Sequence, residues 1–585
     1  MALRQVLRLA PWPVRRRIFE TVEARVLPRV APERRLRVAR TFMPLATARV
    51  RGAGGATLRV RTKAGVLTAR ADPAAAPAEV RRSNLDRVGK ALDEAGVDWF
   101  RVPVRAAGRT AVAVRAADRA EALAALRRHV ADDRGSLRVT RPGRRRKSPQ
   151  VVSVCWPVTD PGGSLLLGHD VACEVEFWTA RDGRLVSPRR NPVADSIPAG
   201  EPVTVAPEAV FGSFSAPGDT TGYRTRRIFT SVDPDRVDFP IDVVYTWVDG
   251  DDPEWQRRKT RALADNPWVG EVSTQAANDS RFASRDELRY SLRALHCFAP
   301  WVRRVFLVTD DQAPAWLDRS HPRLTVVSHR EIFGDTGRLP TFNSQAIESR
   351  LHRIPGLAEH FLYLNDDVIL GRPVTPEMFF TPGGLTKFFA SAARVDTAPR
   401  GPADRPADSA AKNNRRLIQE TFGRMLTRKM MHTPHPSRRS VIAEIEARFG
   451  EQVTATAGHQ FRHPDDISLL SSLQQYYAYL TGKAAPGRIR YLYTDLSEPV
   501  TPFRLARLLR NRDVDAFCLN DVDVHSAAVA DQEALVAEFL PAYLPFTSPF
   551  ELQHRNVRTI AAPRQPSPGR DDRPVPPGVA LPPVA

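Results

Sequence analysis

The sequence contains few cysteines. Its four, Cys155, Cys173, Cys297 and Cys518, lie far apart along 585 residues. No pair has the spacing of a zinc-ligand motif, and four cysteines are too few for a disulfide framework in a chain of this length. We therefore expect free thiols and a reducing compartment.

Long hydrophobic runs are also missing. No stretch reaches the about 18 consecutive apolar residues that identify a membrane-spanning helix, so we expect no span. The N-terminal sequence is basic, but Pro11 and Pro13 interrupt it and no apolar core of a secretory signal follows. These absences favour a cytoplasmic location.

Positive charge is concentrated in one part of the chain. Residues 1–150 contain 35 Lys and Arg against 13 Asp and Glu, whereas the remainder contains 51 against 53. A basic segment can contact anionic lipid, nucleic acid or an anionic polymer. No module that interleaves aromatic and basic residues stands out, so nucleic acid is the weakest of these three, and we expect no nucleic-acid partner. Three interpretations stay open: the basic segment holds a glycan acceptor, it contacts the inner face of a membrane, or it is an Arg-rich face that is merely solvated.

The chain is too long for a single core, and its composition and periodicity change several times along its length. In the second segment below, residues 56–71 alternate like a hairpin, and residues 83–104 predict a helix capped by Ser83 or Asn84 and then a strand. The predicted segments are a basic helical N-terminal segment (1–50), a small α/β unit (51–148), a β-rich segment (149–237), a catalytic domain (238–560) and a disordered Pro-rich tail (561–585).

From residue 239 onward, apolar strands alternate with helices, and several strands end in acidic residues. The alternation predicts an α/β fold with a mainly parallel, doubly wound sheet, like that of nucleotide-sugar transferases, with helical insertions. One predicted helix covers residues 284–301 and begins with a capping box of Ser284 and Glu287. Another covers residues 343–357, and residues 395–412 are predicted to form a polar loop.

The segment "HFLYLNDDVILGR", residues 360–372, interrupts an apolar strand with Asn365, Asp366 and Asp367. Two adjacent carboxylates beside a core are costly unless a cation or hydrogen bonds meet them. In α/β transferases such a pair holds a divalent cation on the diphosphate of a nucleotide sugar. We predict Mg²⁺ or Mn²⁺ at Asp366 and Asp367, joined by Asp521 of "CLNDVD"; simple turns are the alternative at both places.

Several histidines lie in loops with an arginine. They include His432, His435, His459 and His463, with Arg462 between the last two. Their spacing does not support a metal site. A histidine and an arginine do suit phosphoryl transfer, which needs a base for the incoming hydroxyl and a cation for the phosphoryl oxygens.

Five long blocks of the chain resemble, in order, the four conserved regions of the Stealth family. The resemblance covers about residues 240–555, and it is more specific than any single motif. The blocks are "IDVVYTWVDGDDPEW", "SRFASRDELRYSLRALHCFAPWVRRVFLVTDDQAPAWL", "LPTFNSQAIESRLHRIPGLAEHFLYLNDDVILGRPV", "HTPHPSRRSVIAEIEARFGEQVTATAGHQFRHPDDIS" and "FCLNDVDVHS".

That family contains bacterial capsular and exopolysaccharide phosphotransferases and the catalytic part of the animal N-acetylglucosamine-1-phosphotransferase. The resemblance implies transfer of a sugar 1-phosphate from a nucleotide sugar, typically a UDP-sugar, to a hydroxyl of a glycan acceptor, with release of UMP. It also implies four catalytic residues: Glu348, Asp367, His432 and Arg462. From the residues alone, Glu348 would be assigned to a solvated helix face. In the catalytic cluster, Glu348 either orients His432 or completes the ligand shell of the metal, and both roles stay open.

The end of the first strand of the catalytic domain is where a base and ribose commonly bind in such folds. Tyr245, Thr246, Trp247 and Asp249 are therefore predicted to contact the nucleotide, with Trp247 stacking on the base. Arg281, Arg285 and Arg289 precede or begin a helix, and one of them, with Arg281 as the candidate, is predicted to contact phosphate. The alternatives are a core position for Trp247 and a surface ion pair for the arginine.

Two other functions remain as rivals. A metal-dependent glycosyltransferase would use the same donor and carboxylates but release UDP, and it would need the His432 and Arg462 pair less. A non-catalytic polyanion-binding protein would depend on the basic residues before residue 150 and not on Asp367.

Overall fold

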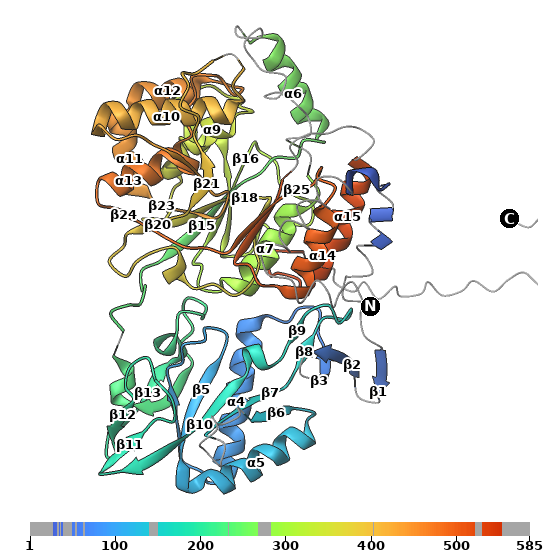
Figure 1. The fold of residues 1–585 in the computed structure, drawn as a ribbon, viewed down its shortest axis with the longest axis vertical. Coiled ribbons are helices and arrows are strands. Elements are labelled where there is room, and N and C mark those ends of the chain that lie inside the picture. Colours follow the sequence, from blue (N-terminus) through green and yellow to red (C-terminus); the bar gives the residue numbers. More distant parts are fainter. Residues whose placement is uncertain are drawn as a thin grey trace, which may run out of the picture. The chain divides into compact units, whose positions relative to one another are not determined.

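A computed structural model gives the fold of the protein (Figure 1). It describes residues 27–31, 34–35, 37–38, 49–52, 55–62, 65–139, 150–231, 233–266, 282, 284–401, 403–520 and 529–552. Apart from Leu552, these all belong to one compact unit, Met1–Glu551. Most of the predicted basic segment and the whole Pro-rich tail lie outside the described residues. None of the described helices has the length and apolar character needed to cross a bilayer.

The N-terminal part opens with the predicted hairpin. Its strands β2 and β3 pair antiparallel, with Thr62 opposite Gly65, which confirms the prediction. They belong to a five-stranded sheet of order β1-β2-β3-β8-β9. Its strands are β1 (Arg49–Gly52), β2 (Gly55–Thr62), β3 (Gly65–Ala71), β8 (Val158–Thr159) and β9 (Leu166–Leu167).

A second sheet joins the predicted α/β unit to the predicted β-rich segment. Its central pair, β5 and β10, is parallel and comes from opposite sides of the boundary predicted at residues 148/149, so the two segments share one sheet and one core. The strands are β4 (Trp99–Val102), β5 (Thr110–Arg115), β6 (Ser136–Val139), β7 (Val151–Cys155), β10 (Cys173–Arg181), β11 (Arg184–Val186), β12 (Ser196–Pro198), β13 (Val203–Pro207) and β14 (Gly222–Arg226).

Two helices pack with this sheet, α4 (Pro77–Glu94) and α5 (Arg119–Asp132). Helix α4 begins earlier than predicted, because Pro77 occupies its first turn, where a missing N–H costs nothing. Asn84 is therefore not a cap. It is buried, donates to the carbonyl of Val171 (2.9 Å) and accepts from the N–H of Trp156 (2.9 Å).

The predicted catalytic domain is built on a five-stranded sheet of order β17-β16-β15-β18-β23. The first four strands are parallel, and β23 is antiparallel to β18. This arrangement confirms the mainly parallel α/β fold. The strands are β15 (Ile241–Thr246), β16 (Val305–Thr309), β17 (Leu324–Ser328), β18 (His360–Asn365) and β23 (His435–Arg438).

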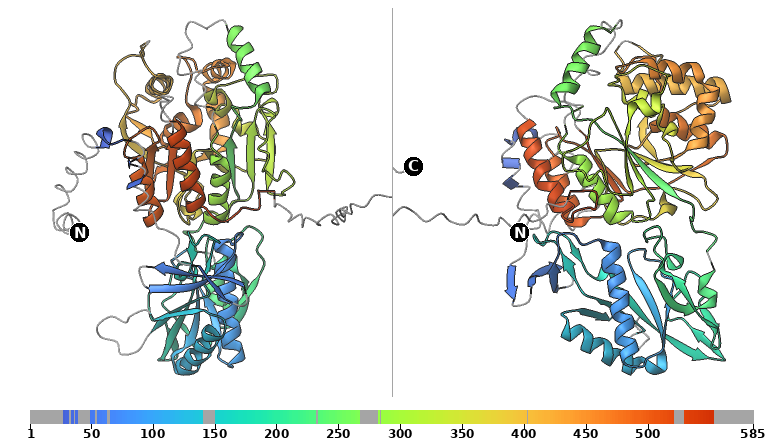
Figure 2. Two further views of the ribbon diagram at one scale, coloured as in Figure 1. Left: turned by 90° about the vertical axis from the view of Figure 1, so that its right-hand side faces the viewer. Right: turned by 180° about the vertical axis from the view of Figure 1, so that it is seen from behind.

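Side chains alternate between the two faces of this sheet, as the pleat requires. In β15, Val243 and Tyr245 join one core cluster and Val244 joins the other; in β18, Leu364 and Tyr363 separate in the same way. Helices cover both faces, with α7, α14 and α15 on one and α9 to α13 on the other (Figures 1 and 2). The helices are α6 (Pro253–Ala264), α7 (Glu287–Phe298), α8 (His329–Phe333), α9 (Ser344–Glu348), α10 (Pro406–Phe422), α11 (Arg439–Arg448), α12 (Gly450–Gly458), α13 (Gln474–Leu480), α14 (Thr501–Asn511) and α15 (Val529–Tyr543).

The apolar run around residues 360–370 is two strands and not one. Strand β18 ends at Asn365, the chain turns at Asp366 and Asp367, and β19 (Val368–Leu370) enters a separate three-stranded sheet of order β19-β26-β25. The aspartate pair therefore lies where two sheets meet. The remaining strands are β25 (Tyr491–Asp495) and β26 (Ala516–Asn520), β20 (Thr386–Phe388) with β24 (Ala484–Pro486), and β21 (Ala390–Arg394) with β22 (Arg428–Met430).

Other boundaries also differ from the prediction. The helix predicted over residues 343–357 is the short α9 followed by a 3₁₀ turn at Leu351–Arg353, and the predicted loop over residues 395–412 contains the start of α10. Further short turns of 3₁₀ or π type are Leu27–Arg29, Ala116–Asp118, His169–Val171, Glu208–Phe211, Arg227–Thr230, Pro376–Met378 and Leu469–Leu473.

Candidate active site

The turn between β18 and β19 fixes the two predicted aspartates. Asp366 Oδ1 accepts the backbone N–H of Asp367 (3.2 Å), and the Asp367 carbonyl accepts the N–H of Leu519 from β26 (3.2 Å). A side-chain bond within the turn and a backbone bond to β26 thus hold it. Burial, the charge of Glu287 and that of Asp367 together raise the pKa of Asp366 well above its usual range.

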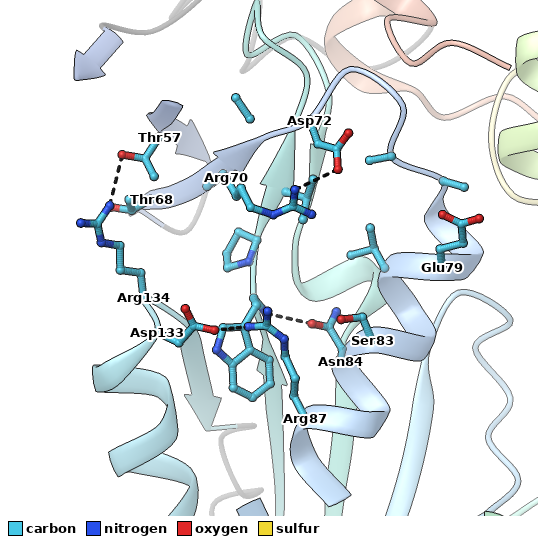
Figure 3. Close-up of a pocket in the computed structure, with 18 of the residues that line it drawn as sticks. Thr57, Thr68, Arg70, Asp72, Glu79, Ser83, Asn84, Arg87, Asp133 and Arg134 are labelled. Carbon is cyan, nitrogen blue, oxygen red and sulfur yellow. Dashed lines mark hydrogen bonds and ion pairs between the residues drawn. The ribbon is translucent and has the colours of Figure 1, made fainter. Parts of the chain in front are cut away.

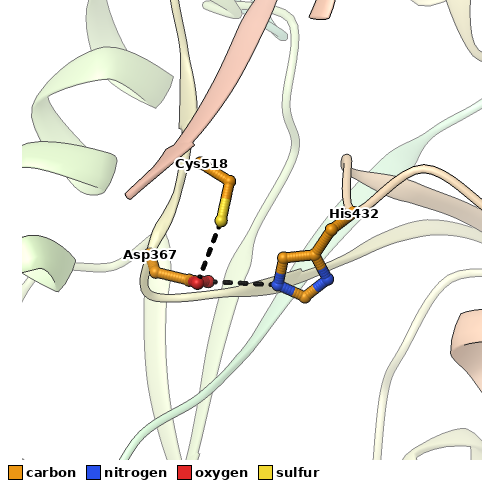
Figure 4. A group of neighbouring side chains, drawn as sticks. All are labelled: Asp367, His432 and Cys518. Atoms are coloured by element: carbon orange, nitrogen blue, oxygen red, sulfur yellow. Dashed lines mark hydrogen bonds and ion pairs between the residues drawn. The ribbon is translucent and has the colours of Figure 1, made fainter. Parts of the chain in front are cut away.

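The Asp367 carboxylate contacts two side chains that come from distant parts of the chain (Figure 4). Its Oδ1 lies 3.3 Å from His432 Nε2, and its Oδ2 accepts the thiol proton of Cys518 (Sγ to Oδ2, 3.1 Å). Burial opposes ionisation of Asp367, but the charge and hydrogen bond of His432 outweigh it and lower its pKa. Reciprocally, burial lowers the pKa of His432, and Asp367 more than offsets this, so the pKa of the imidazole is raised.

His432 lies in the loop between β22 and β23, and its neighbour His435 serves a different purpose. His435 is the first residue of β23, is fully enclosed, and stacks on the Tyr363 ring with 6.3 Å between centroids. Burial lowers the pKa of His435 to about 3, so it stays neutral. Of the two histidines in "HTPH", only His432 faces the aspartate.

Glu348 is the last residue of α9, and it is buried and not on a solvated face. Its carboxylate accepts both the backbone N–H of Ser471 (3.2 Å) and the Ser471 hydroxyl proton (2.9 Å). Burial raises its pKa, and the hydrogen bonds of Ser471 and the charges of Arg462 and His432 oppose that rise. Glu348 is therefore a buried carboxylate within electrostatic reach of both cationic side chains.

Arg462 is positioned by the loop that follows α12. Its guanidinium donates to the hydroxyl of Ser344, the first residue of α9 (2.9 Å), while its buried Nε has no hydrogen-bond partner among the described residues. The buried Asp466 anchors this loop, accepting from Asn343 Nδ2 (2.8 Å), His459 Nδ1 (2.7 Å) and a backbone N–H. Since Asn343 also caps α9, the same residues fix α9 and the arginine.

These contacts bring together the four residues that the family resemblance implies. The pKa of His432 responds to Asp367 and Glu348, which raise it, and to Arg462, which lowers it. Two carboxylates and a guanidinium, whose Nε is unpartnered among the described residues, thus lie within electrostatic reach of the His432 imidazole and form one cluster with it, drawn from α9, the β18–β19 turn and two loops. Such a cluster can bind an oxyanion and move a proton.

The predicted nucleotide-binding residues divide into two groups. Tyr245 is 1% exposed with its hydroxyl on Ser291 Oγ (2.8 Å), and Trp247 belongs to the same core cluster, so we drop both as contacts of a base. Thr246 and Asp249 are half-buried at the end of β15 and in the loop after it. Arg281 lies outside the described residues, and its prediction stays untested.

Two of the three predicted metal ligands lie among the described residues. Asp366 and Asp367 supply adjacent carboxylates, which fit a hard cation such as Mg²⁺ or Mn²⁺ in ligand type. Asp521 lies outside the described residues. The thiol beside Asp367 was not predicted as part of any site, although Cys518 directly precedes "LND" at a strand end. Its position opposite Val368 follows from strand pairing that the sequence alone does not display.

A separate cavity of about 610 Å³ lies in the N-terminal part (Figure 3). It contains none of the four clustered residues. Three arginines line it together with four acidic residues, and two of the arginines are paired, Arg70 with Asp72 (2.9 Å) and Arg87 with Asp133. Its charges are balanced, which does not favour a site for a polyanion. The lining residues are Thr57, Thr68, Ala69, Arg70, Ala71, Asp72, Ala74, Ala75, Ala76, Glu79, Val80, Ser83, Asn84, Arg87, Asp132, Asp133, Arg134, Trp156, Pro157 and Val158.

Comparison with known families gives four matches in chain order. They are Stealth protein CR1, conserved region 1 (residues 239–267), CR2, conserved region 2 (281–388), CR3, conserved region 3 (431–479), and CR4, conserved region 4 (506–561). Glu348 and Asp367 fall in the second region, His432 and Arg462 in the third, and Cys518 in the fourth.

Relatives match over most of the chain. Exopolysaccharide phosphotransferase SCO6023 of Streptomyces coelicolor is 46% identical over 505 residues, which cover 83% of this chain and 85% of that protein. Exopolysaccharide phosphotransferase CpsY of Mycobacterium tuberculosis is 36% identical over 425 residues, 72% and 77% of the two chains. Among solved structures, the galactosyltransferase LgtC in complex with donor and acceptor sugar analogues matches at 11% identity and a TM-score of 0.27, over 52% of this chain and 96% of that one. The last likeness is too slight to carry an argument.

Proposed function

The chain belongs to the Stealth family, and on this premise we propose that it is an exopolysaccharide phosphotransferase. An acceptor hydroxyl of a glycan attacks the sugar-bearing phosphorus of a nucleotide sugar, a UDP-sugar in the simplest case. The new bond is a phosphodiester between two sugars, the bond broken is the diphosphate bridge, and UMP leaves. The observation that carries the proposal is the single cluster of Glu348, Asp367, His432 and Arg462.

His432 is the proposed base for the acceptor hydroxyl. A base must gain a proton easily, and the contact with Asp367 increases the proton affinity of the imidazole. Burial works in the opposite direction, and Asp367 and Glu348 together outweigh it. Asp367 also fixes the orientation of the ring through Nε2. The other ring nitrogen, or a movement of the ring on substrate binding, then serves the hydroxyl.

Arg462 is the proposed partner of the transferred phosphoryl group. Its guanidinium is held by Ser344, and its buried Nε is unpartnered among the described residues, which leaves a donor for a phosphoryl oxygen. A charged donor held in place in a buried site stabilises developing negative charge more strongly than one in water. Glu348 lies within electrostatic reach of Arg462 and offsets part of its charge when no substrate is present.

Asp366 and Asp367 are the proposed holders of Mg²⁺ or Mn²⁺, with Asp521 as a further candidate. When bound there, the cation would neutralise charge on the diphosphate of the donor. The carboxylates supply the oxygen ligands that such ions prefer.

The decisive experiment identifies the nucleotide that is released. Purified protein is incubated with Mg²⁺ or Mn²⁺, a panel of nucleotide sugars and short glycan acceptors, and the products are resolved by mass spectrometry. Release of UMP with a phosphate-linked sugar on the acceptor supports the proposal. Release of UDP would mean attack at carbon and would favour the glycosyltransferase alternative.

A further inference from the structure

The side chains of Asp367, His432 and Cys518 have the geometry of a three-ligand metal site. Their ligand atoms all lie within 4.8 Å of one another, and no other group of three His, Cys, Asp or Glu side chains in the described part of the chain does so. The closest pairs are Oδ1 to Nε2 at 3.3 Å and Oδ2 to Sγ at 3.1 Å. In a tetrahedral zinc site, bonds of roughly 2.0–2.3 Å place neighbouring ligand atoms roughly 3.3–3.7 Å apart.

The three ligands come from separate elements that are fixed independently. Cys518 is in the middle strand of the three-stranded sheet, paired with Val368 on one side and Tyr493 on the other. Asp367 follows β18, and His432 precedes β23, the strand that pairs with β18. A cation that enters between them would need small side-chain movements and no change of fold.

The donor set selects a class of cation. One carboxylate oxygen, one imidazole nitrogen and one thiolate sulfur are typical ligands of Zn²⁺ and of Co²⁺ as its substitute, whereas Mg²⁺ takes oxygen ligands in octahedral geometry. The side chains of His432 and Asp367 are 32% and 21% exposed, so an ion can reach them from solvent, with the buried Cys518 behind them.

We propose that Asp367, His432 and Cys518 form a binding site for Zn²⁺ with an open fourth position, and that occupation of this site switches the enzyme off. Binding replaces the thiol hydrogen by the metal, and the proton leaves to solvent. The inhibition rests on the proposed function, because the ion would occupy both the imidazole that is to act as base and the carboxylate that is to hold Mg²⁺. The metal site itself rests only on the geometry.

The test of the site uses Co²⁺ as a spectroscopic probe on the full, reduced chain. We expect one Co²⁺ per chain, with a thiolate-to-cobalt charge-transfer band in the near ultraviolet and the visible bands of a tetrahedral ion, all abolished by Zn²⁺. Cys518→Ser should remove the charge-transfer band. Cys297→Ser, which changes another buried cysteine outside the cluster, should keep it. Absence of the band in the unmodified protein at saturating Co²⁺, or its persistence in Cys518→Ser, would overturn the proposal.

The test of inhibition measures UMP release while Zn²⁺ is titrated against a fixed concentration of Mg²⁺. Each variant is compared with its own rate in the absence of Zn²⁺. Cys518→Ser should raise the half-inhibitory Zn²⁺ concentration by roughly tenfold or more, because losses of this size follow from changes even in the groups that merely support metal ligands. An unchanged half-inhibitory concentration would refute the inhibitory role.

The two arms separate the possible failures. UMP release without a thiolate band leaves the proposed function standing and removes the zinc site. A thiolate band without any UMP release keeps the site and removes the proposed function.

Discussion

At the residue scale, His432 and Arg462 carry the sharpest prediction. His432→Ala and Arg462→Ala should each lower kcat by ~10² or more, because each removes a group that acts on the reacting atoms. Donor binding, measured by calorimetry, should persist and weaken far less than kcat, since neither residue is assigned to the base or the ribose and Arg462 acts on the transferred phosphoryl group. Arg416→Ala is the matched control, because within the described part of the chain that arginine makes only an exposed pair with Glu420 on α10. Near-normal turnover in either active-site variant would remove that residue from the mechanism.

Glu348 gives a second prediction, and the structure helps to choose between its two open roles. Its contacts are with Ser471 and the charges of Arg462 and His432, which favours positioning these side chains over a place in the metal shell. Glu348→Gln keeps the size of the side chain and removes its charge. We expect kcat to fall by roughly 10², with no change in the concentration of Mg²⁺ or Mn²⁺ needed for half-maximal rate.

Ser471→Ala separates orientation from charge. It removes the hydroxyl donor to Glu348 but keeps the backbone N–H donor, so kcat should fall by less than in Glu348→Gln. An increased metal requirement in Glu348→Gln would return this residue to the metal shell. Equal rates for Glu348→Gln and the unmodified enzyme would show that the carboxylate has no role.

The sequence alone could identify only part of this cluster. Asp367 can be recognised in the sequence as a carboxylate within an apolar run. The burial of Glu348 cannot, because it depends on α9 ending after five residues and on Ser471, 123 positions later in the chain. The secondary-structure propensities of single residues do not reveal contacts between residues so far apart in the sequence. The same limit explains Tyr245, whose place at a strand end indicated a ligand contact, while the pleat turns its side chain into the core.

At the scale of elements, the close approach of β19 to the loop before β26 gives the third prediction. A Cβ on Gly371 would lie 2.6 Å from the carbonyl oxygen of Val514 and 3.0 Å from its Cγ2. Gly371→Ala should therefore push the two segments apart and cost about 1–3 kcal/mol of unfolding free energy, measured by urea denaturation. Since β19 follows Asp367 directly, the variant should also lower turnover.

Gly383→Ala is the matched control for that substitution. Among the described residues nothing lies within 4 Å of a Cβ at Gly383, and its φ is outside the left-handed range. Its stability should stay within about 0.5 kcal/mol of that of the unmodified protein, as for most surface changes. Equal stability of the two glycine variants would contradict the tight contact at β19.

Glu446 links α11 to the segment after α9 and gives a pH-dependent prediction. Its carboxylate pairs with Arg350, His352 (2.8 Å) and Arg353 (2.6 Å). Burial disfavours its ionisation, but these partners outweigh burial and lower its pKa to about 2. Because this folded-state pKa lies below that of the unfolded chain, about 4.3, the stabilisation is complete above that value and is lost as the pH falls toward 2.

Glu446→Gln should be less stable than the unmodified protein at pH 7, and its melting temperature should fall less steeply between pH 5 and pH 2. Calorimetry at a series of pH values measures both. Glu420→Gln, at an exposed pair on α10, should change neither quantity appreciably. A slope in Glu446→Gln as steep as that of the unmodified protein would contradict the assignment.

The sequence predicts strands better than it predicts boundaries. Alternating and apolar runs located β2, β3, β15 and β18, because successive side chains of a strand point to opposite faces of the sheet and the sequence pattern follows that period. Helix starts were less accurate. Residue 286 adopts a left-handed conformation (φ 61°) as the N-cap of α7, so the helix begins at Glu287 and not at Ser284. There the backbone N–H of Arg285 donates to the Glu287 carboxylate (2.5 Å), a local bond that replaces the expected capping box.

At the scale of the whole molecule, strands from different predicted segments pair in one sheet, so the segments predicted along the sequence are not separate in the fold. Residues 110–115 and 173–178 form the central parallel pair of one sheet, and Glu377 of the catalytic part accepts from Ser213 Oγ (2.6 Å) and from the N–H of Val237 (3.2 Å). Composition changes along the sequence therefore mark changes of local structure and do not mark independent folding units. A change of local structure can be told from a boundary between folding units only by the pairing of distant strands, which the sequence alone does not reveal.

The uneven charge of the chain supports the last prediction, which concerns anionic membranes. Residues 1–48 contain 11 arginines against three glutamates, and each basic residue near an anionic bilayer contributes roughly 1 kcal/mol at low salt. The full chain should co-sediment with vesicles that contain anionic lipid and much less with neutral vesicles, and added salt should weaken the binding. Replacement of Arg15, Arg16 and Arg17 by Gln should lower the bound fraction, whereas the same change at residues 144–146 controls for total charge. Equal binding of the first variant and the unmodified chain would leave the basic segment as a solvated surface, the alternative that its composition allows.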